Sequence, residues 1–191
     1  MHKLKRSQKA LYWVSLIGLY SGMRLQEICQ LELTDVKQVE GIWVFDINKD
    51  GSHKKLKNNQ SKRLVPIHNT LLSSGLLEHH QQAKNKGHRR LFEDVSLACD
   101  GSYSSIFSKR FSWLLKQLSI KTNKTSFHSF RHNFVDALRN AEIEDSLLKA
   151  IIGHADNSVT YRYGTAVGVT KLKRAMDMVK YNLDIETTRQ E

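Results

Sequence analysis

The sequence is poor in the features that mark exported, disulfide-rich and membrane-spanning proteins. It has two cysteines, Cys29 and Cys99, and neither has the paired spacing of a zinc site or a disulfide framework. No apolar run approaches the ~18 residues of a membrane span. Residues 1–9 are basic and polar, without the apolar core of a signal peptide. These absences predict a cytoplasmic protein without a membrane partner, in which both cysteines are buried apolar residues.

Acidic residues are scarce relative to basic ones. Nineteen Asp and Glu stand against thirty Lys and Arg, which gives a formal net charge of +11 at pH 7. Such an excess, in a chain of otherwise ordinary globular composition, is typical of proteins with a polyanionic partner. Double-stranded DNA is the leading candidate, and a solvated basic surface is the alternative.

The length of 191 residues predicts one domain, with residues 1–8 as a basic lead-in and residues 183–191 as a flexible tail. Apolar residues at helical spacing predict helices over residues 9–20, from residue 23, and over 69–86, 102–118, 129–140, 145–152, 158–163 and 169–181. Short β-like runs at 42–47, 55–57 and 63–67 predict strands. The fold class is therefore α+β, mainly α-helical with a small antiparallel β-sheet.

Several cationic side chains have the chemistry of phosphate binding. Gly22 ends the first helical pattern, and Arg24 opens the next helix with Glu27 three residues later on the same face. Farther along, His128 and Arg131 share one side of a helix whose other side is apolar. An imidazole and a guanidinium at this spacing can bind the oxygens of one phosphate, although two surface residues often show the same spacing.

A histidine and two tyrosines follow the next apolar helix. Gly153 tolerates a positive φ and suits the C-terminal cap of that helix, and His154 comes directly after it. A short predicted helix then carries Tyr161 and Tyr163. These two side chains lie about 200° apart around a helix, so only one of them can face a given pocket.

Together these motifs resemble the catalytic domain of the tyrosine recombinase and phage integrase family. The resemblance rests on SGMRLQEICQLEL, on HSFRH and on Gly153-His154 with a tyrosine nine residues later, in family order over about residues 9–181. It implies the tyrosine recombinase catalytic-domain fold. It also implies that four side chains hold the attacked phosphate: Arg24, His128, Arg131 and His154.

The resemblance implies roles for the other site residues as well. Tyr163 is the expected nucleophile, rather than its neighbour Tyr161, and Glu27 supports the first arginine. His132 follows the second arginine as in the family. A helical histidine beside apolar residues is more often buried and structural, so we give His132 a supporting role.

A lysine in a β-hairpin completes the family pattern, and the string KNNQSKRLVP puts Lys57 at that position. Its neighbours Lys54, Lys55 and Lys62 leave the choice open, because hairpin register cannot be fixed from the sequence. Lysine has a reference pKa of ~10.4, so it is a protonated donor suited to the departing 5′-oxygen.

The resemblance implies site-specific DNA recombination, in which strands are cleaved and rejoined through a covalent 3′-phosphotyrosine without metal, ATP or another cofactor. The sequence has no Asp, Glu and His cluster with metal-ligand spacing, and two arginines and two histidines can supply the positive charge instead. One alternative is a non-catalytic helix-turn-helix DNA-binding module, since residues 145–164 have that spacing. Another is strand relaxation of the type IB topoisomerase kind.

The last predicted helix carries an apolar stripe of Leu172, Ala175, Met176 and Val179. The stripe can close the chain's own core or dock into a neighbouring subunit. Because relatives exchange such a segment, our hypothesis is a homotetramer on DNA with trans docking. The family's N-terminal core-binding domain is expected to be absent, since only 23 residues precede Arg24.

Residues without a partner at catalytic spacing have simpler expected roles. Surface positions are expected for five histidines: His53, His68, His79, His80 and His88. Core positions are expected for the tryptophans Trp13, Trp43 and Trp113.

Overall fold

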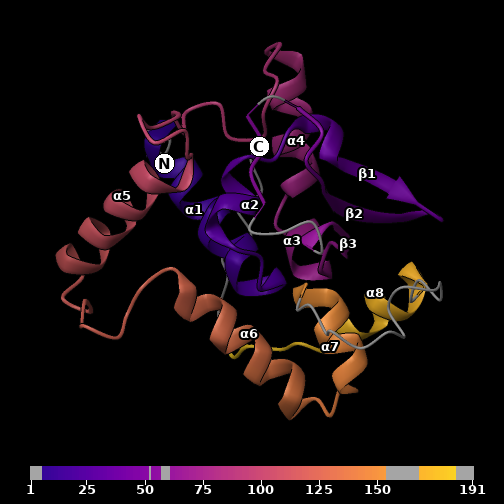
Figure 1. The fold of residues 1–191 in the computed structure, drawn as a ribbon. Coiled ribbons are helices and arrows are strands. Elements are labelled where there is room, and N and C mark those ends of the chain that lie inside the picture. Colours follow the sequence, from indigo (N-terminus) through magenta and orange to yellow (C-terminus); the bar gives the residue numbers. More distant parts are fainter. Residues whose placement is uncertain (1–5, 52, 57–60, 154–167, 184–191) are drawn as a thin grey trace.

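The computed structural model describes residues 6–51, 53–56, 61–153 and 168–183. The helices are α1 (Arg6–Ser21), α2 (Leu25–Cys29), α3 (Asn69–Ser73), α4 (Leu76–Asn85), α5 (Ser104–Gln117), α6 (His128–Asn140), α7 (Asp145–Ile152) and α8 (Val169–Asp177). A short 3-10 helix, η1 (Leu33–Asp35), precedes the strands β1 (Val36–Val39), β2 (Ile42–Ile47) and β3 (Arg63–Pro66). The predicted fold class, mainly helical with a small antiparallel sheet, is confirmed (Figure 1).

The sheet has the order β1-β2-β3, with β2 in the centre and both pairs antiparallel. Glu40 and Gly41 form a two-residue loop between β1 and β2, and both have a positive φ, 51° and 77°. Such a loop matches the right-handed twist of a hairpin. The predicted strand over residues 55–57 is wrong for Lys55 and Leu56, which lie outside any strand, and β1 takes the third place.

Helix α1 is the centre of the helical part, because it contacts α2, α3 and α6. Phe134 and Leu138 of α6 are fully buried, as their spacing predicted. Gly22, with φ +60°, lies against the Phe134 ring, and a Cβ at this position would be 2.4 Å from that ring. The turn that leads from α1 into α2 therefore requires glycine, and it places Arg24 beside α6.

Helices α7 and α8 lie next to each other and both contact β3 (Figure 1). The apolar stripe predicted for the last helix is buried in the chain's own core, with Met176 of α8 at 0% exposure and Val179, which follows α8, at 1%. After α8 the Tyr181 hydroxyl donates a hydrogen bond to the Leu19 carbonyl of α1 at 3.1 Å. In the single chain, the stripe thus packs in cis.

Several further local expectations are wrong. The predicted helix over residues 69–86 is two helices, because Gly75 adopts the left-handed conformation with φ +92° between α3 and α4. His68 is buried and caps α3, and its Nε2 bonds to the Val179 carbonyl at 3.0 Å. Trp113 is 61% exposed, and Cys99 is also on the surface.

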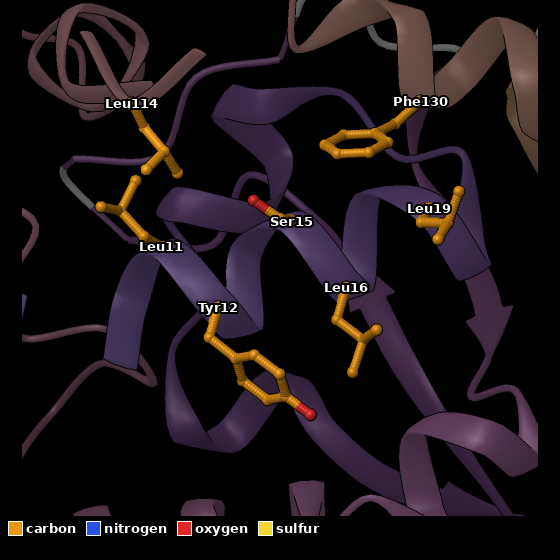
Figure 2. A pocket seen from close by; sticks show the side chains of 7 residues that line it. All are labelled: Leu11, Tyr12, Ser15, Leu16, Leu19, Leu114 and Phe130. Atoms are coloured by element: carbon orange, nitrogen blue, oxygen red, sulfur yellow. The ribbon is translucent and has the colours of Figure 1, made fainter. Parts of the chain in front are cut away.

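Among the residues that the structure describes, no helix combines the length and the apolar character needed to cross a membrane. An apolar groove of about 390 Å³ lies between α1, α5 and α6, where Leu16, Leu114 and Phe130 face it (Figure 2). The described residues that line this groove include no charged side chain. It is therefore unsuited to binding a phosphate.

His79 of α4 was expected at the surface but is partly buried, and it provides a titration test of the fold. Its ring stacks between Trp13 and Phe92, and its Nε2 bonds to the Leu91 carbonyl at 3.2 Å. Burial lowers the pKa of His79 to about 4. A base with a depressed folded pKa stabilises the fold least in acid, because the unfolded chain takes up a proton that the folded imidazole resists.

We expect the free energy of unfolding of the parent to fall between pH 6.5 and pH 4, and His79→Phe to show a smaller fall. The variant should also lose about 1 kcal/mol at pH 7, because it lacks the hydrogen bond to Leu91. Urea unfolding at pH 7, 6 and 5 measures both effects, with exposed His53→Phe as the control. An equal acid-induced loss in parent and His79→Phe would contradict the assignment.

Candidate active site

The site is built around the carboxylate of Glu27, whose side chain is 3% exposed. Arg24 has extended backbone angles just before α2, so its N–H donates to Glu27 Oε2 at 2.9 Å. The Arg24 side chain turns back to the same carboxylate, with Nη1 2.8 Å from Oε1. The predicted pairing of Arg24 with Glu27 on one face is present in the structure.

A second arginine, Arg63 at the start of β3, binds the same carboxylate. Its Nη2 lies 3.0 Å from Glu27 Oε2 and its Nη1 lies 3.3 Å from Oε1. Burial alone raises the pKa of Glu27, but the charge of Arg63 and the hydrogen bonds from both arginines outweigh it. The net pKa of Glu27 is below its ordinary value, so the carboxylate is ionised at neutral pH.

Arg131 of α6 is the third guanidinium of the cluster, and it is 6% exposed. Its Nη1 donates to the Gly22 carbonyl and its Nη2 to the Ile152 carbonyl, both at 2.7 Å. Burial, with the charges of Arg24 and Arg63, lowers the pKa of Arg131 to about 10. It still carries its charge at neutral pH. Arg24 and Arg63 bind the Glu27 carboxylate, and Arg131 is close enough to be affected by their charges. Three guanidinium groups thus lie around one carboxylate, and this surplus of positive charge favours an anion such as phosphate.

The C-terminus of α7 joins this cluster. Arg63 Nε donates to the Ile151 carbonyl at 2.8 Å, and Arg131 binds the next carbonyl, that of Ile152. The last carbonyls of a helix lack partners within the helix and carry partial negative charge, so two cations are well placed there. Gly153 then caps α7 with φ 65° and ψ 47°, as the sequence predicted.

The two histidines of α6, His128 and His132, are exposed, whereas Arg131 of the arginine cluster is buried. His128 is the first residue of α6, and its ring meets that of His132 edge to face, with centroids 4.7 Å apart. Both histidines are exposed, so the interpretation of His132 as a buried structural residue is wrong. The expected roles of both in supporting or contacting phosphate stay predictions.

Four of the predicted residues lie outside the described part of the chain: Lys57, His154, Tyr161 and Tyr163. The neighbouring lysines are described. Lys54 is bound to Asp35 at 2.7 Å and to Asn48 at 2.9 Å, and its side chain is 5% exposed. Lys55 donates to the Asp100 carbonyl at 3.1 Å, whereas Lys62 is exposed.

Arg63 is the residue that the motif analysis missed, since the string KNNQSKRLVP was used only to place Lys57 and the strand over residues 63–67. A signal was present in the alternation of the strand. Side chains two residues apart share a face, and Val65 is fully buried, so Arg63 points to the same inner face. An inward-facing arginine requires a carboxylate partner, and Glu27 supplies it.

The described residues contain no group of three or more His, Cys, Asp and Glu side chains arranged to hold a metal ion. Their site chemistry is instead that of fixed guanidinium groups on helix ends and a strand. Such groups can neutralise an anion and hold it in one orientation without changing their own protonation.

Comparison with known proteins agrees with this geometry. The model of the phage integrase family matches residues 1–167. The chain belongs to the phage integrase family. Within the curated proteins, it is 26% identical over 161 residues to a tyrosine recombinase of Agathobacter rectalis, covering 80% of this chain and 46% of the relative. It is also 26% identical to the tyrosine recombinase XerA of Pyrococcus furiosus, covering 82% of this chain and 50% of that protein.

Solved structures share the fold of this integrase-family chain. The XerH site-specific recombinase bound to its difH substrate superposes with a TM-score of 0.57 at 19% identity, covering 82% of this chain and 42% of that one. The Tn1549 transposon integrase in complex with transposon right end DNA gives 0.56 at 21% identity, covering 91% and 59%. The chain spans about half the length of the curated relatives it matches.

The cap of α7 yields a stability prediction for this integrase-family site. A Cβ at Gly153 would lie 2.9 Å from Arg63 Nη1 and 3.1 Å from its Cδ, whereas nothing lies within 4 Å of a Cβ at Gly41. Both glycines have a positive φ. We expect Gly41→Ala to cost about 1–2 kcal/mol for its backbone alone. Gly153→Ala should cost about 1–3 kcal/mol more, because Arg63 must move. Chemical denaturation measures the free energy of unfolding of both variants. Equal losses would show that the Arg63 side chain moves away from a new Cβ without cost.

Proposed function

We propose that this chain is the catalytic domain of a site-specific DNA recombinase that cleaves and rejoins strands through a covalent 3′-phosphotyrosine on Tyr163. The observation that carries the proposal is the clustering of Arg24 and Arg131, which are far apart in sequence: Arg24 binds the buried Glu27 carboxylate, and Arg131, near enough to be affected by the charge of Arg24, binds the Ile152 carbonyl at the end of α7. Family membership supports it, as does the shared fold with recombinases bound to DNA.

The cleavage step requires charge neutralisation and two proton transfers. The Tyr163 oxygen attacks phosphorus, and the bond from phosphorus to the 5′-oxygen breaks. Arg24 and Arg131 hold the non-bridging oxygens, whose negative charge increases in the transition state. The tyrosine proton passes to His128, and the leaving 5′-oxygen takes a proton from Lys57.

Rejoining is the reverse of cleavage with another strand. A free 5′-hydroxyl attacks phosphorus and gives its proton to Lys57, the bond from phosphorus to the Tyr163 oxygen breaks, and that oxygen takes back its proton from His128. The phosphodiester energy is kept in the enzyme linkage, so the proposed reaction uses no ATP. We assign the charge neutralisation that a metal ion can supply to Arg24 and Arg131. His154 follows directly after Gly153 in the chain, and we assign it to the same phosphate.

The choice of Lys57 as the acid gains support by elimination. Lys54 is held by Asp35 and Asn48, and Lys55 is bound to the Asp100 carbonyl. A lysine already bound to a buried carboxylate has to give up that bond before it can reach a leaving oxygen. Lys62 is the remaining competitor near the hairpin.

A homotetramer on DNA through Leu172, Met176 and Val179 stays a prediction. These side chains are already buried within the same chain, so a trans arrangement requires α8 to leave its own core. The proposed recombinase chemistry does not depend on the outcome.

Trapping on nicked DNA tests the nucleophile. A nick just beyond the scissile phosphate leaves only a short strand with the new 5′-hydroxyl after cleavage. That short strand diffuses away and cannot rejoin, so the covalent intermediate accumulates. With a pool of nicked duplexes of randomised sequence, we expect the parent and Tyr161→Phe to form a covalent adduct, and Tyr163→Phe to form none. Denaturing gels measure the adduct. Adduct formation by Tyr163→Phe would refute this nucleophile, and binding without any adduct in the parent would favour a non-catalytic DNA-binding module.

A sulfur leaving group tests the acid. Lys57→Ala should slow cleavage by roughly 10²- to 10⁴-fold on ordinary DNA. A substrate with sulfur at the 5′-bridging position should restore most of that rate, because a thiolate departs without a proton. Lys62→Ala is the matched control and should keep the parental rate on both substrates. If Lys62→Ala showed the selective rescue instead, the acid would be Lys62.

A further inference from the structure

The side chain of Arg63 connects three segments that carry the proposed catalytic groups. It binds Glu27 of α2, the Ile151 carbonyl at the end of α7, and the Ser61 carbonyl at 3.0 Å, in the stretch between Lys57 and β3. The side chain is 7% exposed. Among the described residues, Arg63 is therefore the physical link between the hairpin, the first arginine and the turn before His154.

The donors of Arg63 are nearly all used within the protein. A guanidinium has five N–H donors. Nε binds one acceptor, Nη1 binds two and Nη2 binds one, which leaves one N–H without a described acceptor. A group bound in this way cannot supply the bidentate contact that arginines make with phosphate. Its contribution has to pass through the groups that it holds.

We propose that Arg63 is a positioning residue of the cleavage reaction, which fixes the C-terminal turn of α7 and the strand after Lys57 against the Arg24–Glu27 pair. The inference rests on the proposed function, and it assigns to Arg63 a role distinct from phosphate binding. Its loss removes the described donor to the Ile151 carbonyl and leaves Arg24 as the remaining described cation hydrogen-bonded to Glu27. The C-terminal turn of α7 and the strand after Lys57 are then no longer held in a fixed position relative to Arg24.

Only arginine satisfies this geometry. The four bonds reach three separate groups from three nitrogens in one plane, whereas a lysine ammonium offers all its donors at one point. Gly153 adds a steric argument, since its missing Cβ leaves the space that the guanidinium and Cδ of Arg63 occupy. Lysine at this position keeps the charge and most of the volume but cannot span Glu27 and the Ile151 carbonyl together.

Arg90 is the matched control. Its side chain is 12% exposed, its Nη1 donates to the Val95 carbonyl at 2.9 Å, and its guanidinium lies over the Tyr103 ring at 4.3 Å from the centroid. Like Arg63 it is a largely buried arginine bound to backbone carbonyls. Its described partners include none of the proposed catalytic groups. Arg90→Lys therefore reports the general cost of replacing such a residue.

The experiment compares the parent, Arg63→Lys, Arg63→Ala and Arg90→Lys in single-turnover adduct formation on nicked DNA, with affinity for the same DNA measured separately. Arg63→Lys should slow adduct formation by roughly 10- to 100-fold while its Kd stays within about threefold of the parental value, because small misplacements act on rate. Arg90→Lys should keep the parental rate. Methylguanidinium should restore part of the rate of Arg63→Ala, since it can occupy the vacated space beside Gly153.

Several outcomes would overturn the proposal. They are a near-parental rate in Arg63→Lys, an equal loss in Arg90→Lys, or a rate loss matched by an equal loss of affinity. Circular dichroism shows whether each variant is folded, and if Arg63→Ala unfolds, Arg63→Lys carries the test. A parent that forms no adduct would refute the recombinase function and this inference together. An active parent with an active Arg63→Lys would refute this inference alone.

Discussion

The carboxylate of Glu27 is the interaction on which the rest of the site depends. Burying several guanidinium groups side by side is costly unless an anion neutralises part of their charge. Glu27 provides that anion, and its two oxygens are divided between Arg24 and Arg63. Its own burial follows from the Gly22 turn, because that turn lies against Phe134 and starts α2 beside α6. The packing of the Phe134 ring against Gly22 thus helps to set the position of Glu27 and of the arginines around it.

The end of α7 shows how the same charges also build the fold. Two successive carbonyls receive hydrogen bonds from Arg63 and Arg131, and Gly153 turns the chain immediately afterwards. Structural and functional contributions of these arginines therefore overlap. Because the acceptors are backbone atoms, the side chains of Ile151 and Ile152 can change without loss of this bonding. Such an arrangement is compatible with the low sequence identity between this chain and the structures that share its fold.

Much of this organisation is predictable from the sequence where one local rule dominates. The pairing of Arg24 with Glu27 follows from helical spacing, and the cap at Gly153 follows from its freedom of backbone conformation. The missed elements depend on distant contacts. β1 has a mixed polar pattern and is stabilised by pairing with β2, and His68 is buried because the segment after α8 returns to it. The importance of Arg63 likewise appears only when β3, α2 and the end of α7 are brought together.

The cis packing of α8 has a consequence for the segment between α7 and α8. Residues 154–167, which include His154 and Tyr163, are joined to α7 at one end and continue through Gly168 into α8 at the other. Ile152 before this segment and Val169 after it are both buried, so the core holds the two points at which the segment is attached. Releasing α8 from the core would free one of those points. An exchange of α8 between chains would therefore act on the attachment of this segment as well as on the contact between the subunits.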